Sequence, residues 1–435
     1  MNFKEANRII NRNEFYTFMG KVKRISGLLI EATGTRYKVG EVCRIITNER
    51  DRVLDCEVVG FNDDRVLLMP YEDIKGVGLG NVVVTTGQKL RIQVGDFLKG
   101  RVINAKGEAI DDGEPFEGGE HCYVDNTYIN PLNRPRINET LSFGVKAIDG
   151  MLTIGKGQRM GIFAGSGVGK STLLGMVAKN VKADINVIAL VGERGREVRE
   201  FIEKDLGPEG LARSIVVVAT SDQPAMLRLK CALVATTIAE YFKDQGKDVL
   251  LMMDSLTRFA MAQREIGLAT GEPPVSRGYT PSIYAELPKL LERSGNFYKG
   301  SITGIYTVLV EGDDTNEPIS DTVRGIVDGH IVLTRQLANQ NHFPAIDVNM
   351  SISRLMNDIA SDEHKKSAKV LRDVLSIYYS NYDLISIGAY KKGSNPKLDV
   401  AIDKIDDVNE FLMQGINEAL NFEETLDVMS EISNS

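Results

Sequence analysis

The chain has 435 residues, a net charge of −8, 43% hydrophobic and 26% charged residues, four cysteines and four histidines. This length predicts about two to three domains with a large buried core, and the acidic balance disfavours nucleic acid as the main partner. No apolar run approaches the ~18 residues that span a bilayer. The charged N-terminus is unlike a signal peptide, so we expect a soluble cytoplasmic protein. The cysteines and histidines have neither disulfide-framework nor metal-ligand spacing.

The first segment, residues 1–19, is predicted to contain an amphipathic helix over residues 2–18. Its apolar face consists of Phe3, Ala6, Ile9 and Ile10. Two interpretations stay open. We favour a helix that docks on its own protein or on a neighbouring subunit, and the alternative is a contact with a membrane surface or a partner protein.

Residues 20–88 alternate short β-prone runs with turn residues, which is typical of a small barrel or sandwich. The runs are LLIEAT, VCRIIT, CEVVGF, RVLLMP and NVVVTT. Nothing in this region indicates catalysis, and it lacks basic residues interleaved with aromatics, so we expect an assembly or packing module. Residues 89–137 are turn-rich, include the extended stretch NPLNRP, and are predicted to be a connecting segment.

Residues 138–360 alternate apolar strands with helices, which predicts a parallel sheet buried on both faces. The expected strands are 186–192, 214–220, 248–254, 302–312 and 329–334. Residues 361–435 show helical periodicity to the end of the chain. The fold class is therefore α/β, with a small β domain before the sheet and a helical domain after it.

The most informative motif is a glycine-rich loop between the strand Met160–Phe163 and a helix expected from Thr172. It fits the phosphate-binding (P-loop) pattern with one departure, because the strict form has Gly where this chain has Ala164. The backbone N–H groups of such a loop converge on a phosphate, Lys170 reaches the terminal phosphates, and the Ser171 hydroxyl holds Mg²⁺. The predicted nucleotide-binding residues here are Ala164, Gly165, Ser166, Gly167, Val168, Gly169, Lys170, Ser171 and Thr172.

Two acidic residues follow buried strands, and ligand groups in open α/β sheets lie beyond the carboxyl ends of strands. Asp254 ends the strand VLLMMD and is predicted to anchor Mg²⁺, with an N-cap of the next helix as the alternative. Glu193 follows the strand NVIALVG and could polarise the water that attacks the terminal phosphate, or be a surface acid. Arg194 beside it could contact phosphate or position Glu193.

Several stretches together resemble the flagellum-specific ATPase of bacterial type III protein export. They are similar also to injectisome secretion ATPases and, more distantly, to the catalytic subunits of rotary ATP synthases. The resemblance runs from about residue 20 to the C-terminus. The segments that carry it are GVKAIDGMLTIGKGQRMGIFAGSGVGKST, GERGREVREF, TSDQPAMLR, DSLTRFAMAQREIGLATGEPP, GYTPSIYAELPKLLERSG, EGDDTNEPISD and HFPAIDVNMSISR.

The resemblance implies a P-loop (RecA-like) ATPase domain, an N-terminal β-barrel, a C-terminal helical domain and a homohexameric ring that hydrolyses ATP with Mg²⁺. It implies that Ala164 is an accepted variant and that Glu193 is the catalytic glutamate. Arg194 matches the neighbouring arginine, and Asp254 matches the Mg²⁺-associated aspartate. Taken alone, Arg354 would be a salt-bridge residue and Phe343 a core residue. The resemblance instead makes Arg354 an arginine finger offered across a subunit interface and Phe343 the aromatic that packs on adenine. Arg258 matches an arginine near the nucleotide interface.

The resemblance also implies partners. The loops near 271–278 and 311–318 resemble segments that face a central stalk, and the N-terminal segment corresponds to a part associated with a regulator and the membrane surface. Chaperone–cargo complexes and a membrane export gate are the remaining expected partners, at the inner face of the membrane. The sequence leaves flagellar and injectisome export open. A rotary synthase subunit, a ring RNA helicase and a non-catalytic nucleotide-binding subunit are the weaker alternatives.

Overall fold

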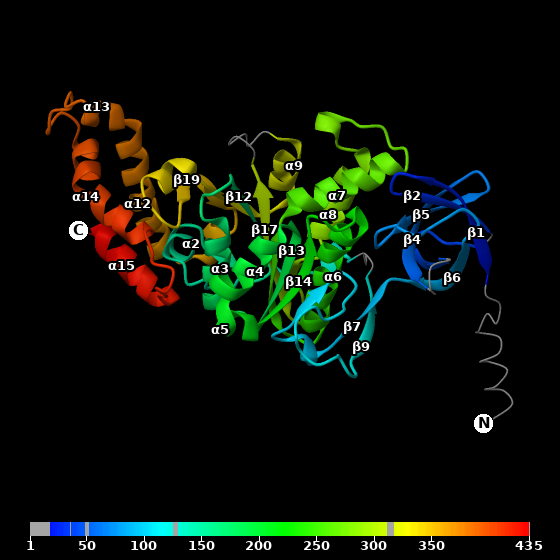
Figure 1. Cartoon of the computed structure of the whole chain (residues 1–435). Coiled ribbons are helices and arrows are strands. Elements are labelled where there is room, and N and C mark those ends of the chain that lie inside the picture. Colours follow the sequence, from blue (N-terminus) through cyan, green and yellow to red (C-terminus); the bar gives the residue numbers. More distant parts are fainter. Residues whose placement is uncertain (1–17, 35, 48–51, 125–128, 311–316, 435) are drawn as a thin grey trace.

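A computed structural model of the chain describes residues 18–34, 36–47, 52–124, 129–310 and 317–434. The described part has three regions side by side, with a β-barrel at one end, a large sheet with its helices in the middle and a helical region at the other end (Figure 1). The helix expected over residues 2–18 lies, apart from its last residue, outside the described residues. No helix among the described ranges is long and apolar enough to cross a membrane.

The barrel closes in the strand order β1-β2-β5-β4-β3-β6. Its strands are β1 (Met19–Ser26), β2 (Leu29–Thr33), β3 (Glu41–Ile46), β4 (Val53–Asn62), β5 (Arg65–Pro70) and β6 (Val82–Lys89). Alternate residues point inward, as in any half-buried strand, and the interior holds Val22, Ile30, Ile45, Leu54 and Val83. The structure therefore has a barrel, and not the alternative sandwich. β1 lies outside the predicted runs because its outward residues are mostly polar.

A buried ion pair joins the barrel to the central region. Lys230 lies on α6 (Ala225–Asp244), and its Nζ donates to Glu57 of β4 at 2.7–2.8 Å. Tyr71 donates its hydroxyl to the same carboxylate. Lys230, Glu57 and Tyr71 are 7%, 8% and 1% exposed. Because breaking one partner of a buried pair leaves an uncompensated charge, this contact fixes how the barrel sits on the central region.

The connecting segment is more structured than its turn-rich sequence indicates. β7 (Arg91–Val94) pairs with β9 (Glu120–Tyr123), and the short helix η1 (Asp96–Leu98) follows β7. β8 (Val102–Asn104) pairs in parallel with β14 (Ser214–Thr220) and so becomes the edge strand of the central sheet. β8 is thus part of the central sheet, where pairing with β14 satisfies its backbone groups, while β7 and β9 form a separate two-stranded sheet.

The central sheet has the order β19-β18-β12-β17-β15-β13-β14-β8, with β16 (Gly295–Asn296) paired to β17. The remaining strands are β12 (Arg159–Ala164), β13 (Ile185–Glu193), β15 (Asp248–Asp254), β17 (Ser301–Leu309), β18 (Gly329–Leu333) and β19 (Ile346–Ser353). The strands from β8 to β18 run parallel along this order, so their carboxyl ends share one edge, and β19 runs antiparallel to β18. β19 is absent from the strands expected from the sequence. A two-stranded sheet of β10 (Thr140–Leu141) and β11 (Ile154–Gly155) lies outside the central sheet.

Helices cover both faces of the sheet, as the buried runs of its strands require. The helices of this region are α2 (Lys146–Met151), α3 (Lys170–Asn180), α4 (Gly195–Glu200), the π-helical turn η3 (Phe201–Leu206), α5 (Gly207–Ala212), α6, α7 (Leu256–Ala269), α8 (Pro281–Leu291), α9 (Pro318–Ile326) and α10 (Arg335–Asn339). The stretch REVREFIEKDL, whose sequence predicts one helix, is divided into α4 and η3.

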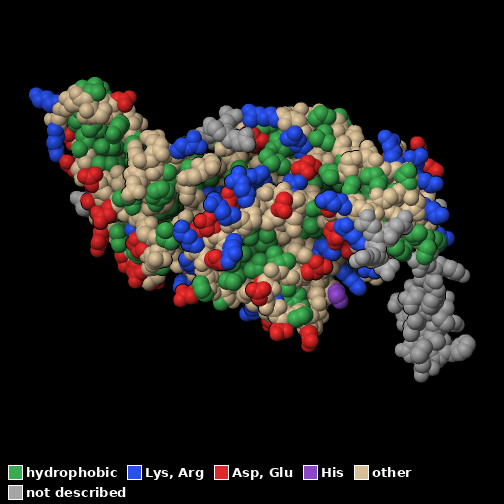
Figure 2. Space-filling model, viewed as in Figure 1, with side chains coloured by type: hydrophobic (Ala, Val, Ile, Leu, Met, Phe, Trp, Pro, Cys, Tyr) green, Lys and Arg blue, Asp and Glu red, His purple; other side chains and the backbone are tan. Residues whose placement is uncertain are grey.

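The C-terminal region is helical, as predicted. It comprises α11 (Met356–Ile359), α12 (Asp362–Ser380), α13 (Tyr382–Ser386), α14 (Pro396–Leu412) and α15 (Phe422–Asn434). Gln414 attaches this region to the central one, since its amide donates to Gly144 O at 2.8 Å and accepts from Lys146 N at 2.8 Å. On the face shown in Figure 2, acidic and basic side chains are interspersed over all three regions.

Candidate active site

The P-loop turns at the carboxyl end of β12, which lies between β18 and β17 in the parallel part of the sheet. Gly167 (φ 78°) and Gly169 (φ 86°) adopt the left-handed conformation that favours glycine. α3 begins at Lys170, two residues before the expected Thr172, so the Lys170 and Ser171 amides belong to the first turn of the helix. The free N–H groups of that turn and the helix dipole suit a phosphate. Ala164 is the last residue of β12 and is 1% exposed, so its methyl group packs in the core.

Lys170 lies between two carboxylates that come from neighbouring strands. Its Nζ donates to Asp254 Oδ1 and lies 3.7 Å from Glu193 Oε1. All three side chains are nearly buried, at 12%, 7% and 13% exposure respectively. β13 and β15 pair in parallel with Leu190 opposite Asp254, which places both acids at the same edge of the sheet. The structure thus brings together three residues that are far apart in the sequence.

Asp254 is oriented by the next strand. Thr307 of β17 donates its hydroxyl to Asp254 Oδ1 at 2.7 Å in a buried contact. Ser255, and not Asp254, caps the following helix, because Ser255 Oγ accepts from Arg258 N at 3.3 Å. This excludes the alternative interpretation of Asp254 as the N-cap. Thr307 was not identifiable from the sequence, since only the pairing of β15 with β17 brings it to the site.

Gly192 directs the Glu193 side chain toward the P-loop. Gly192 (φ 70°) forms a β-bulge, since Val191 lies opposite Ala219 and Glu193 opposite Thr220. Bulges re-aim a side chain next to functional sites. A Cβ on Gly192 would lie 3.1 Å from Arg258 Cβ, so the close packing of α7 also requires glycine here. The Arg258 Nε beside this turn is buried and has no hydrogen-bond partner among the described residues.

The environment of Glu193 favours its protonated form. Burial, followed by the charge of Asp254, raises the pKa of Glu193 to about 7, while Lys170 acts in the opposite direction. Its Oε1 is buried without a hydrogen-bond partner in the described structure. A carboxyl group with a pKa near neutrality is suited to exchange protons with a reacting water.

Two predicted residues lie at the periphery of this cluster. Arg194 is 74% exposed and pairs with Glu197 at 2.7 Å, so in this structure its guanidinium is turned toward solvent. Phe343 lies over the loop instead, because its ring atoms lie 3.5 Å from the position of a Cβ on Gly169. Phe343 is 41% exposed, and Gln414 N donates to the Phe343 carbonyl at 2.9 Å. Phe343 thus presents an exposed aromatic surface beside the expected phosphate position.

Arg354 lies at the opposite edge of the sheet. Its N–H donates to Asp328 O at 3.0 Å, and Asp328 contacts Arg159, the first residue of β12. The P-loop begins at the other end of β12, five residues on, which is about 16 Å at ~3.3 Å per residue. Arg354 is exposed and is not part of the cluster around Lys170.

The residues at the loop fit a nucleotide-bound Mg²⁺. Mg²⁺ prefers oxygen ligands and keeps several waters, and it is usually held by one or two carboxylates and substrate phosphates. Ser171 Oγ on the first turn of α3 and the Asp254 carboxylate supply such oxygens. Within the described ranges no group of three His, Cys, Asp or Glu side chains could hold a metal by itself. A cation here would therefore take its remaining ligands from phosphate and water.

Three family models match the chain region by region. They are the nucleotide-binding domain of the ATP synthase alpha/beta family over residues 144–353, the beta-barrel domain of that family over residues 22–87, and the T3SS EscN ATPase C-terminal domain over residues 360–431. A flagellum-specific ATP synthase of Bacillus subtilis (strain 168) is 54% identical over 98% of this chain and 97% of its own length. The chain belongs to the flagellar and type III secretion ATPase family.

Solved structures extend the similarity to the whole architecture. The assembled ATPase EscN of the enteropathogenic E. coli type III secretion system matches with a TM-score of 0.89 and 44% identity, over 95% of this chain and 100% of that one. EscN in complex with its central stalk EscO matches with a TM-score of 0.88, at the same identity and coverage. The chain is therefore an ATPase of a family that serves type III protein export, and the prediction of barrel, P-loop domain and helical domain is confirmed.

The raised pKa of Glu193 makes a prediction about stability. The pKa of Glu193 is about 4.5 in the unfolded chain and about 7 in the folded chain. The contribution of protonated Glu193 to the free energy of unfolding therefore decreases as the pH rises from 4.5 to 7 and is absent above pH 7. Glu193→Gln removes the ionisation. We expect its thermal unfolding midpoint relative to wild type to rise from pH 5 to pH 8 in calorimetry. Glu203→Gln, at an exposed acid, serves as the control. A difference that is independent of pH would contradict the prediction.

Proposed function

We propose that this chain hydrolyses ATP with Mg²⁺ at the Lys170 cluster and that its ring supports export of flagellar proteins. The observation that carries the proposal is the convergence of Lys170, Glu193 and Asp254 at the end of a P-loop strand. Glu193 polarises the attacking water. Lys170 and the amides of the loop stabilise the charge that develops on the phosphate, and Ser171 and Asp254 hold the cation, which offsets phosphate charge when it is bound.

The remaining positive charge comes from other residues. Arg258, with its unpartnered Nε beside Gly192, is placed to add positive charge near the water that Glu193 would hold. Arg194 keeps its predicted role near phosphate or Glu193 only if it leaves Glu197, to which it is paired here. Phe343 supplies the surface on which adenine packs.

Arg354 is proposed to act on the site of a neighbouring subunit. It lies about 16 Å from its own P-loop along β12, which is too far for its side chain to span. A homohexameric ring would place this edge of the sheet against the nucleotide of the next subunit, and the similarity to EscN in its assembled form supports an oligomer. An arginine supplied in trans makes hydrolysis depend on assembly.

The proposed partners are inferred from the similarity to EscN and from the resemblance of individual segments to the family. EscN binds a central stalk named EscO, which supports a stalk partner for this chain. The loop 271–278 would face it, and most of the loop 311–318 lies outside the described residues. A regulator at the N-terminal segment, chaperone–cargo complexes and a membrane export gate complete the proposed partners. The proposed location is the cytoplasmic face of the membrane at the export apparatus.

Turnover tests the hydrolytic assignment. Glu193→Gln should bind ATP with near wild-type affinity and lose about 10²- to 10⁴-fold in kcat, because a positioned base contributes that much. Lys170→Ala should weaken ATP binding as well, because Lys170 contacts phosphate. Fluorescent-nucleotide titration and phosphate release measure the two effects. A Glu193→Gln chain that turns over at the wild-type rate would refute the role of Glu193.

Subunit mixing tests Arg354. Arg354→Ala alone should lower kcat by about 10³-fold or more, as loss of an arginine finger does. Rings mixed from Arg354→Ala and Lys170→Ala subunits should recover activity, because an intact P-loop then meets an intact finger. Lack of recovery in mixed rings shown to contain both subunits would count against action in trans.

The export system needs a cellular test. The 54% identity to the Bacillus subtilis protein favours flagellar export, and the 44% identity to EscN keeps an injectisome as the second candidate. We expect crosslinked complexes purified from the native cell to contain flagellar export components. Recovery of injectisome components alone would reassign the system and leave the ATPase function unchanged.

A further inference from the structure

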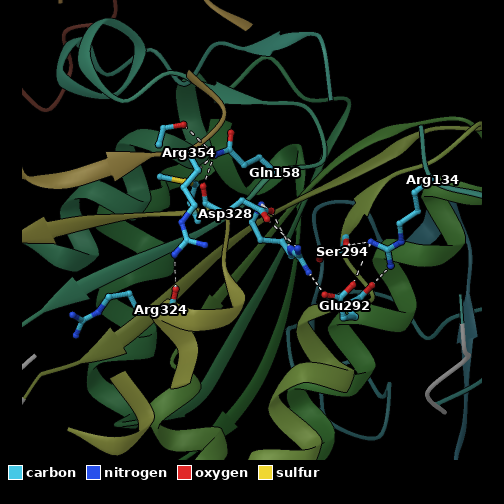
Figure 3. A network of polar contacts seen from close by, with 10 residues as sticks. Arg134, Gln158, Glu292, Ser294, Arg324, Asp328 and Arg354 are labelled. Atoms are coloured by element: carbon cyan, nitrogen blue, oxygen red, sulfur yellow. Dashed lines mark hydrogen bonds and ion pairs between the residues drawn. The ribbon is translucent and has the colours of Figure 1, made fainter. Parts of the chain in front are cut away.

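The backbone N–H of Arg354 is hydrogen-bonded to the carbonyl group of Asp328. The Asp328 carbonyl oxygen accepts from Arg354 N at 3.0 Å and from Gln158 Nε2 at 3.2 Å. Gln158 Nε2 also donates to Ser353 Oγ at 3.0 Å, the residue before Arg354. Figure 3 shows Asp328 between Gln158 and Arg354, with the Arg354 side chain extended toward the Arg324 carbonyl, to which it donates at 3.2 Å. The position of the finger therefore depends on the position of Asp328.

Asp328 is fixed in turn by Arg159. The Arg159 backbone N–H and Nε both donate to Asp328 Oδ2 at 3.0 Å, and the second guanidinium nitrogen donates to Oδ1 at 3.0 Å. The two side chains are 15% and 26% exposed. Bidentate arginine–carboxylate pairs of this kind are among the strongest and most directional polar contacts. Glu292 also pairs with Arg159 but is 56% exposed, so it adds less.

This pair connects two functional elements of the same subunit. Arg159 is the first residue of β12, and the P-loop follows the last residue of that strand. Arg354 is attached through Asp328 to the beginning of β12. The P-loop is attached to the end of the same strand. In a ring, these two elements would serve two neighbouring nucleotide sites.

We propose that Asp328, clamped by Arg159, is the positioning residue for Arg354, and that β12 links the nucleotide site of each subunit to the finger it offers its neighbour. This inference rests on the proposed action of Arg354 in trans. Asp328 touches no substrate. Its effect is exerted on the finger and therefore appears in the neighbouring site.

Asp328→Asn tests the proposal, because it keeps the shape of the side chain and removes the charge that binds Arg159. In a homomeric ring we expect kcat to fall about 10- to 100-fold, since a misplacement of about 1 Å has effects of that size. KM should change less than about two-fold, because the P-loop of the same subunit is intact. Lys156→Met is the matched control. It removes an ion pair with Asp248 at the same edge of the sheet, does not contact Asp328, and should keep the wild-type kcat.

Mixing decides whether Asp328 acts on the neighbour. Rings of Asp328→Asn and Lys170→Ala subunits should recover activity. In such rings the unaltered P-loop of an Asp328→Asn subunit lies next to the correctly positioned Arg354 of a Lys170→Ala subunit. Rings of Asp328→Asn and Arg354→Ala subunits should not recover, because both lack a working finger. An effect of Asp328→Asn on the P-loop of the same subunit predicts the reverse, with recovery beside Arg354→Ala and none beside Lys170→Ala. A general structural defect predicts no recovery in either mixture.

The outcomes separate this inference from the proposed function. If Arg354→Ala recovers with Lys170→Ala but Asp328→Asn does not, the positioning role is wrong and the finger in trans stands. If neither recovers, the finger in trans fails and the positioning role with it. Wild-type kcat in Asp328→Asn would also overturn the inference. Should Asp328→Asn fail to assemble, Arg159→Lys, which keeps the charge and loses the bidentate fork, takes its place in the same mixtures with the same expected results.

Discussion

The site depends on one ammonium group that lies between two nearly buried carboxylates. Lys170 compensates Asp254 and Glu193, which would otherwise repel each other at the end of the sheet. Burial, followed by the charge of Asp254, holds the pKa of Glu193 at about 7 although Lys170 lowers it, so part of the Glu193 population retains a proton at neutral pH. Nucleotide phosphates would compete with the carboxylates for Lys170, and a cation would favour the charged carboxylates. Substrate binding and the ionisation of Glu193 are therefore coupled.

The antiparallel strand β19 places two further candidate site residues, Phe343 and Arg354, at opposite edges of the sheet. Phe343 precedes this strand at the P-loop edge, and Arg354 follows it at the opposite edge. β19 thus separates the aromatic residue proposed to pack on adenine from the arginine proposed to act on another subunit. On that proposal a single subunit is an incomplete catalyst, and the positions of Asp328 and Arg159 matter for the neighbouring site.

Buried polar contacts join the barrel and the C-terminal helical region to the central sheet. The barrel is fixed by the Lys230–Glu57 pair, and the helical region by the side-chain amide of Gln414. The backbone N–H of Gln414 donates to the Phe343 carbonyl. Removing one partner of a buried ion pair or of a buried amide contact is costly, so these contacts fix where the two regions sit on the sheet.

Features that depend on short-range constraints could be predicted from the sequence. Glycine spacing and the strand–helix order predicted the P-loop, short β-prone runs between turn residues predicted most of the barrel, and acids after buried strands indicated Glu193 and Asp254. The sequence did not indicate β1, β8 or β19, whose residues are polar, short or irregular in pattern. The folded structure was needed to show that Thr307 orients Asp254, that Gly192 orients Glu193, and that Arg159 holds Asp328 from 169 residues away. These contacts arise from the register and order of strands, which local sequence does not encode.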